Sequence, residues 1–78
     1  MPEYTEIERR HLHAMARQQI RMITQLHYLD SVPSRNDVVF GVIHGLALAG
    51  ALGPDEMEQL IDELAATTRE HLKKLSHD

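Results

Sequence analysis

Hydrophobic residues recur at intervals of three and four positions along almost the whole chain, which is the period of one face of an α-helix. No stretch alternates between apolar and polar residues as a half-buried strand does. Proline and glycine interrupt the helical pattern near positions 33 and 53. We therefore predict an all-α fold, a single small domain over residues 1–78 with three helices at about 5–29, 35–52 and 54–75.

The first predicted helix begins at Thr5, because Thr5 and Glu8 have the spacing of a capping box. The segment from Asp30 to Pro33 is expected to end it, since proline lacks an amide hydrogen and disfavours helical angles in the residue before it. Gln19 interrupts the apolar stripe of this helix near its middle. The stripe consists of Leu12, Met15, Ala16, Met22, Ile23, Leu26 and Leu29.

Local signals also bound the second and third predicted helices. Ser34 is expected to cap the second helix, with Asp37 in its first turn, and Gly53 to end it in left-handed angles. Pro54 suits the first position of the third helix. Because this connection is short, the two helices should form an antiparallel hairpin with the first helix packed across it. The third helix is expected to bury Met57, Leu60, Ile61, Leu64, Thr68, His71, Leu72 and Leu75.

The second predicted helix is unusually apolar, since Val38 to Leu52 contains no charged side chain other than the titratable His44. At about 100° per residue its apolar positions form two faces. One face consists of Val38, Val39, Val42, Ile43 and Leu46, and the other of Phe40, His44, Ala47, Leu48 and Ala51. We expect this helix to be buried nearly all round, by more partners than its two neighbouring helices supply.

Gly41, Gly45 and Ala49 follow one another at four-residue spacing, which allows another helix backbone to approach closely. Either a helix of the same chain or a second subunit could use this groove. The apolar run is shorter than the roughly 20 residues of a membrane span and has charged flanks, so we expect no membrane contact. We expect a homodimer through this helix, with help from the first. The candidate dimer or partner interface is Phe40, Gly41, His44, Gly45, Leu48 and Ala49.

The composition also favours association. A chain of 78 residues buries a small core, and without cysteine it has no disulfide to supplement that core. The net charge of −4 argues against a dedicated nucleic-acid binder. The first residues, Met1 to Tyr4, lack the pattern of a signal peptide, and we expect a cytoplasmic protein.

Six histidines are a high number for this length, but no histidine is followed by a second ligand residue at the spacing typical of a metal site. We predict no metal and no cofactor. His44, between Phe40 and Leu48, is expected to be neutral and hydrogen-bonded in the core or at an interface. An alternative is a pH switch in which association weakens when His44 becomes charged.

A basic row lies opposite the apolar stripe of the first helix, and no acidic residue occurs between Arg9 and Leu29. The row consists of Arg10, His13, Arg17 and Arg21. It is either a solvated helix exterior, a surface for an acidic protein, or a phosphate-binding surface. One acidic surface of the second kind is the protein's own Asp55, Glu58 and Asp62 in another copy.

No catalytic motif is recognisable: the chain lacks a cysteine nucleophile, a Gly-x-Ser-x-Gly elbow and a phosphate-binding glycine loop. We therefore expect a protein that is not an enzyme, a small interaction protein that binds and modulates a larger cytoplasmic protein as an adaptor or inhibitor. The alternatives are a dimeric nucleic-acid-associated regulator that uses the basic row, and a purely structural subunit of an assembly.

Overall fold

The computed structural model describes residues 4–76 and shows three long helices. These are α1 (Glu6–Met22), α2 (Ser31–Leu48) and α3 (Pro54–Ser76), and the short 3₁₀ helix η1 (Ile23–Gln25) extends α1. The described residues contain no strand. The predicted all-α class and the three helices are confirmed, although several of the predicted helix ends are wrong.

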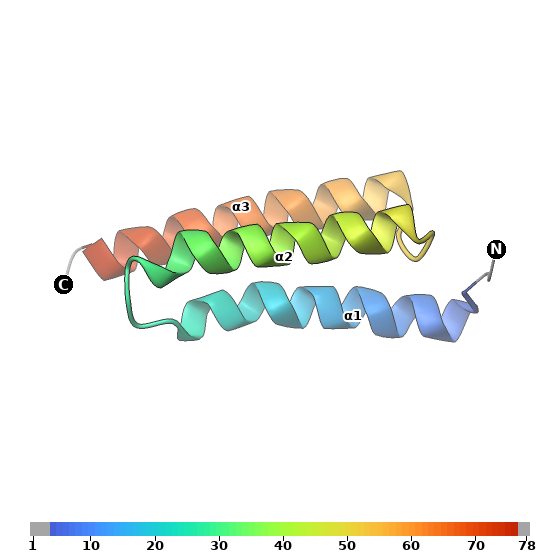
Figure 1. Cartoon of the computed structure of the whole chain (residues 1–78), viewed down its shortest axis with the longest axis horizontal. Helices are drawn as coiled ribbons and strands as arrows, with labels where there is room; N and C mark the ends of the chain where they lie inside the picture. The colour runs from blue at the N-terminus through green and yellow to red at the C-terminus, as the bar shows by residue number, and fades with distance from the viewer. Residues whose placement is uncertain (1–3, 77–78) are drawn as a thin grey trace.

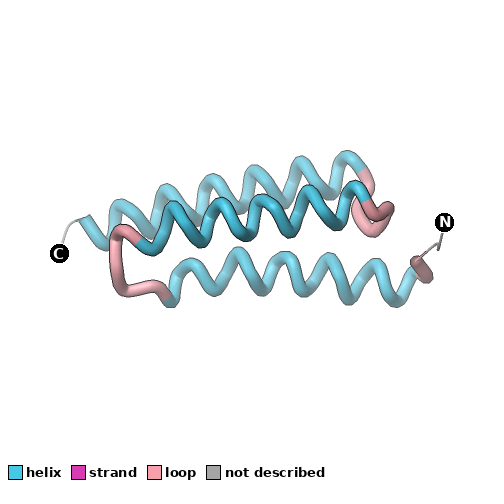
Figure 2. The backbone as a smooth tube through the Cα atoms, viewed as in Figure 1, coloured by secondary structure: helices cyan, strands magenta, loops and turns pink. Residues whose placement is uncertain are grey.

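The three helices lie side by side in a rod (Figure 1). α2 runs back along α3 in the opposite direction, and α1 lies lengthwise beside them (Figure 2). The rod measures 47 × 17 × 15 Å, and its radius of gyration of 13.5 Å exceeds the roughly 11.5 Å of a compact domain of this length. The molecule is therefore elongated, and each helix keeps one side toward solvent.

The core is a narrow apolar column where the three helices meet. It consists of Ala16, Ile20, Ile23, Val32, Val39, Ile43, Leu52, Leu60 and Leu64. The predicted stripe of α3 is confirmed, because its members are buried or partly buried. In α1 the buried side is rotated from the prediction: Ile20 is fully buried, whereas Met15 and Met22 are 43% and 46% exposed. Met15 and Met22 are also at helical spacing, seven residues apart, so the period alone could not show which side of α1 packs against α2 and α3.

The start of α1 agrees with the prediction. The Thr5 side chain accepts a hydrogen bond from the Glu8 backbone amide (3.1 Å), and the Glu8 carboxylate accepts one from the Thr5 amide (2.9 Å). The Thr5 backbone amide holds the pKa of the Glu8 carboxyl below its ordinary value of 4.5.

The end of α1 was predicted about seven residues too late. The α-helix ends at Met22, η1 follows, and Leu26 adopts extended angles. Two bonds favour this ending. The Thr24 hydroxyl donates to the Arg21 carbonyl (2.7 Å), and Nε2 of the buried His71 lies 2.7 Å from the Leu26 carbonyl oxygen. A carbonyl only accepts, so this histidine nitrogen carries the hydrogen. Because His71 is far away in sequence, local patterns could not show this contact.

The start of α2 is also earlier than predicted, at Ser31 in place of Arg35. Pro33 occupies the third position of α2, where an amide hydrogen would have no acceptor within the helix. Ser34 is therefore inside the helix and is not its cap. The residue before the helix is Asp30, which makes no side-chain capping bond.

The end of α2 is four residues before the predicted one, at Leu48. Gly50 has the left-handed φ of 84°, which makes it the terminating residue in place of Gly53. The Gly50 amide donates to the Ala47 carbonyl (3.1 Å) and the Ala51 amide to the Leu46 carbonyl (2.9 Å), as in a Schellman motif. Pro54 begins α3 as predicted.

Candidate interaction surface

The outward side of α2 carries the predicted interface residues, which we name the α2 outer face. It consists of Phe40, Gly41, His44, Gly45, Leu48 and Ala49. Leu48 is 85% exposed and Phe40 43% exposed, and the glycines and Ala49 are exposed as well. Within one chain α2 is therefore not buried all round, and the predicted burial by a further partner stays a prediction. A rod of three helices covers only the side of α2 that faces α1 and α3.

The opposite face of α2 is the internal one. Val39 and Ile43 are fully buried, and Val42 and Leu46 are partly buried. The spacing grouped Val38 with these residues, but it is 54% exposed, so it extends the apolar surface beside the α2 outer face. The structure thus makes most of one predicted face internal and most of the other external. Ala51 and Ala47 were predicted on the external face, but Ala51 is fully buried and Ala47 packs partly buried against the core.

The glycines of the α2 outer face serve no packing role inside this chain. A Cβ atom built on Gly41 or Gly45 would have no atom within 4 Å other than the helix's own backbone. The interpretation that these glycines let α2 pack closely on its own neighbours is therefore wrong. Each costs about 1 kcal/mol of helix stability relative to alanine. Nothing within the described chain offsets that cost.

His44 lies at the edge of the α2 outer face toward Phe40. The centroids of the two rings are 4.4 Å apart, with the ring planes tilted by 46°. The side chain is half-buried, and its Nε2 atom has no hydrogen-bond partner among the described residues. The hydrogen bond predicted for this ring is thus missing at Nε2.

The basic row of α1 is partly neutralised within the molecule. Arg17 contacts Glu63 of α3 at 3.3 Å, and Arg10 lies 3.7 Å from Glu6. His13 is half-buried, and Arg21 is exposed with no acid within ion-pair distance among residues 4–76. Because every side chain of these pairs is at least about a third exposed, each pair contributes only about 0–1 kcal/mol. Even so, the pairing reduces the positive charge that the row offers to a partner.

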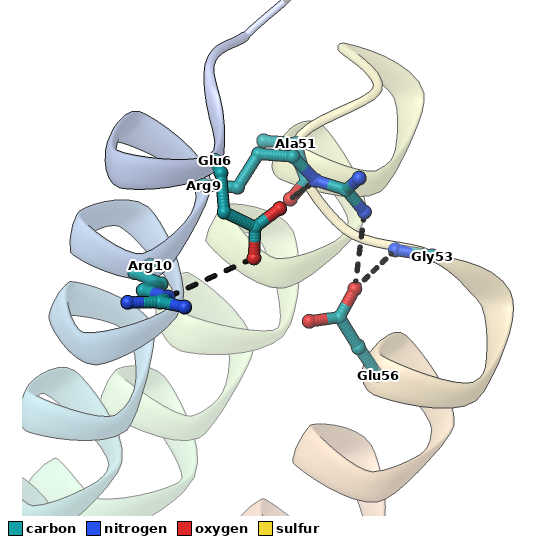
Figure 3. Close-up of polar contacts among 6 residues, drawn as sticks. All are labelled: Glu6, Arg9, Arg10, Ala51, Gly53 and Glu56. Carbon is teal, nitrogen blue, oxygen red and sulfur yellow. Dashed lines mark hydrogen bonds and ion pairs between the residues drawn. The ribbon is translucent and has the colours of Figure 1, made fainter.

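Arg9 forms a polar cluster that the sequence analysis missed (Figure 3). Its guanidinium contacts the Glu56 carboxylate at 3.2 Å and the Ala51 carbonyl at 3.4 Å. The same Glu56 oxygen accepts a hydrogen bond from the Gly53 amide at 2.9 Å. These bonds attach the start of α1 to the connection between α2 and α3. The only local signal was the position of Glu56 three residues after Gly53, where a capping carboxylate is expected.

Glu6, Arg9, Arg10, His13 and Glu56 also line an open cleft of about 260 Å³ at this end of the rod. Its cations face carboxylates of the same chain, so the cleft carries no clear excess of either charge. No three histidine, aspartate or glutamate side chains in the described part of the chain gather where they could hold a metal ion. Among residues 4–76, no helix combines the length and apolar character that crossing a bilayer requires.

Comparisons with protein-family models, curated proteins and solved structures find no match for this chain.

Proposed function

We propose that this chain is a small non-enzymatic interaction protein that binds and modulates a larger cytoplasmic protein, as an adaptor or inhibitor, and that forms a homodimer. Such a role requires a rigid surface of suitable chemistry and no reactive group. The α2 outer face meets this requirement, because it lies on a regular helix held by the buried residues Val39 and Ile43.

A single observation supports this proposal most strongly. The exposed side of α2 from Val38 to Ala49 carries no aspartate, glutamate, lysine or arginine, although Leu48 and Val38 are largely in contact with solvent. Contiguous exposed apolar surface on a small protein is typical of sites that bind other proteins. The basic row supports the nucleic-acid alternative less well, because Arg10 and Arg17 already have carboxylate partners.

The test is capture from a native lysate with the immobilised wild-type chain, followed by purification of the captured protein and a binding titration. The Leu48→Lys variant places a charge on the α2 outer face at an 85% exposed position, where the fold tolerates it. We expect this variant to weaken binding of the purified partner at least about 100-fold, a loss of roughly 2.7 kcal/mol.

Gln18→Lys is the matched control, since it adds the same charge at an exposed position of α1. We expect it to bind like the wild type. Equal binding by wild type and Leu48→Lys would reject the α2 outer face as the site. An affinity that falls by orders of magnitude between about 50 and 200 mM salt would instead favour a phosphate-binding role for the basic row.

A further inference from the structure

The single chain exposes more surface than a monomer of its mass usually does. Its accessible surface is 5654 Å², whereas a folded monomer of 8.9 kDa is expected to expose about 4,800 Å². The elongated shape of the rod contributes to this excess of about 850 Å², which is similar in size to the roughly 800 Å² that each partner contributes to a stable protein interface. The surface of this chain is thus consistent with one interface left open.

The α2 outer face is the surface best suited to form that interface. Leu48 and Phe40 are its exposed large apolar side chains, and the exposed Val38 lies beside it. On α1, Met15 and Met22 lie about 140–160° around the helix from Arg17, which contacts α3 through Glu63. The two half-exposed methionines are therefore on the flank of α1 nearer to α2, where they expose further apolar surface.

The absence of charge on this face favours a second copy of the chain as its occupant. In a two-fold dimer the same patch of both subunits meets itself, so a patch with charges of one sign would repel its copy. The segment Val38–Ala49 has no such charge to oppose self-contact. A partner with a charged patch would find no opposite charge there, whereas homodimer interfaces are the more apolar class.

Gly41 and Gly45 define how close the two copies can approach. Because no neighbouring atom fills the space beside either glycine, that space is open to a helix from outside the chain. Two α2 helices facing each other would bring backbone against backbone at these positions.

We infer that the α2 outer face is occupied by the α2 outer face of a second copy, with the two helices in contact at Gly41 and Gly45. This inference rests on the proposed function, because it names what covers the same site when no larger protein is bound. A larger partner protein then competes with the second copy, and its binding requires that the dimer dissociates.

Sedimentation equilibrium of the purified full chain between about 1 and 200 µM tests this inference. We expect the wild type to approach twice the 8.9 kDa of one chain. Gly45→Leu adds bulk where the monomer has open space, and Leu48→Lys adds charge. We expect each to weaken dimerisation at least about 100-fold while the circular dichroism spectrum stays helical.

Ala14→Leu is the control for added bulk, because Ala14 is exposed on α1 away from this face, and it should dimerise like the wild type. A wild-type mass of one chain across the whole range overturns the inference. So does a dimer that Gly45→Leu and Leu48→Lys leave intact, since the contact is then elsewhere.

A cross-link gives a second, independent measurement, because the chain contains no cysteine. A disulfide needs Cα atoms within about 7 Å of each other. Gly45→Cys mixed with Gly41→Cys should therefore form covalent dimers on oxidation at least about tenfold faster than Ala14→Cys alone. Equal rates would overturn the close contact of the glycines.

The mass measurement and the capture experiment can fail separately. A monomeric wild type that still captures a partner through Leu48 rejects the second copy, and with it the homodimer, but leaves the binding of a larger protein standing. A dimer that captures no partner supports the second copy and rejects modulation of a larger protein.

Discussion

At the scale of single residues, His44 departs most from ordinary packing. Its Nε2 atom is out of contact with water and has no hydrogen-bond partner among residues 4–76. A buried polar atom without a partner costs about 1–3 kcal/mol. The nearby Phe40 ring gives the imidazole an apolar neighbour and no bond. His44 therefore limits the stability of α2 within the single chain.

Replacing His44 by leucine is expected to keep the helical fold and to raise the free energy of unfolding by about 1 kcal/mol, because the unbonded polar atom is removed. Urea denaturation at neutral pH, followed by circular dichroism in dilute solution, measures the change. His27→Leu is the control at an exposed histidine and should change stability by less than about 0.5 kcal/mol. A His44→Leu protein that has lost its helices at neutral pH would refute this view of the site.

At the scale of elements, the helix ends that were predicted correctly were those specified by a few consecutive residues. Thr5 with Glu8 predicted the start of α1, because both partners lie within one helical turn. Pro54 predicted the start of α3, because its fixed φ and missing amide hydrogen suit a first helical position. One of the two bonds at the end of α1 comes from His71, which is 45 residues from Leu26, and no local pattern encodes that contact. Pro33 misled the prediction because proline breaks a helix interior but fits a first turn.

Two glycine-to-alanine substitutions, one inside α2 and one just after its end, are expected to change the free energy of unfolding in opposite directions. Gly50→Ala should lower the free energy of unfolding by about 1–2 kcal/mol, because the φ of 84° is unfavourable for a residue with a Cβ atom. Gly41→Ala should raise it by about 1 kcal/mol, since alanine favours the helix and its methyl group enters open space. Denaturant unfolding of both variants in dilute solution measures the pair. A stabilising Gly50→Ala would contradict the Schellman ending.

At the scale of the whole molecule, the thin rod explains why the sequence predicted the site only in part. The apolar content of α2 and the residues of one face were evident from their spacing. Which face is internal depends on how α1 and α3 pack, and that became clear only from the buried Val39 and Ile43. The Arg9 cluster was missed for the same reason, since Arg9 and Glu56 meet only in the folded chain.

Dimerisation through α2 predicts that thermal stability depends on protein concentration, because binding to a second copy favours the folded state. We expect the melting temperature of the wild type to rise by about 4 °C for each tenfold increase in concentration. The Leu48→Lys protein should melt at a temperature independent of concentration. Melting curves from calorimetry at three concentrations measure both, and a constant wild-type temperature would contradict the proposed dimer.

An odd number of long helices places the start of α1 and the end of α3 at opposite tips of the rod (Figure 1). Joining these tips to make a circular permutant would require a linker that travels most of the 47 Å length, or about 14 extended residues. Fluorescent dyes attached at the two tips would instead sit far apart, and neither would crowd the middle of α2. Energy transfer between such dyes would report whether the rod bends or opens when it meets another protein.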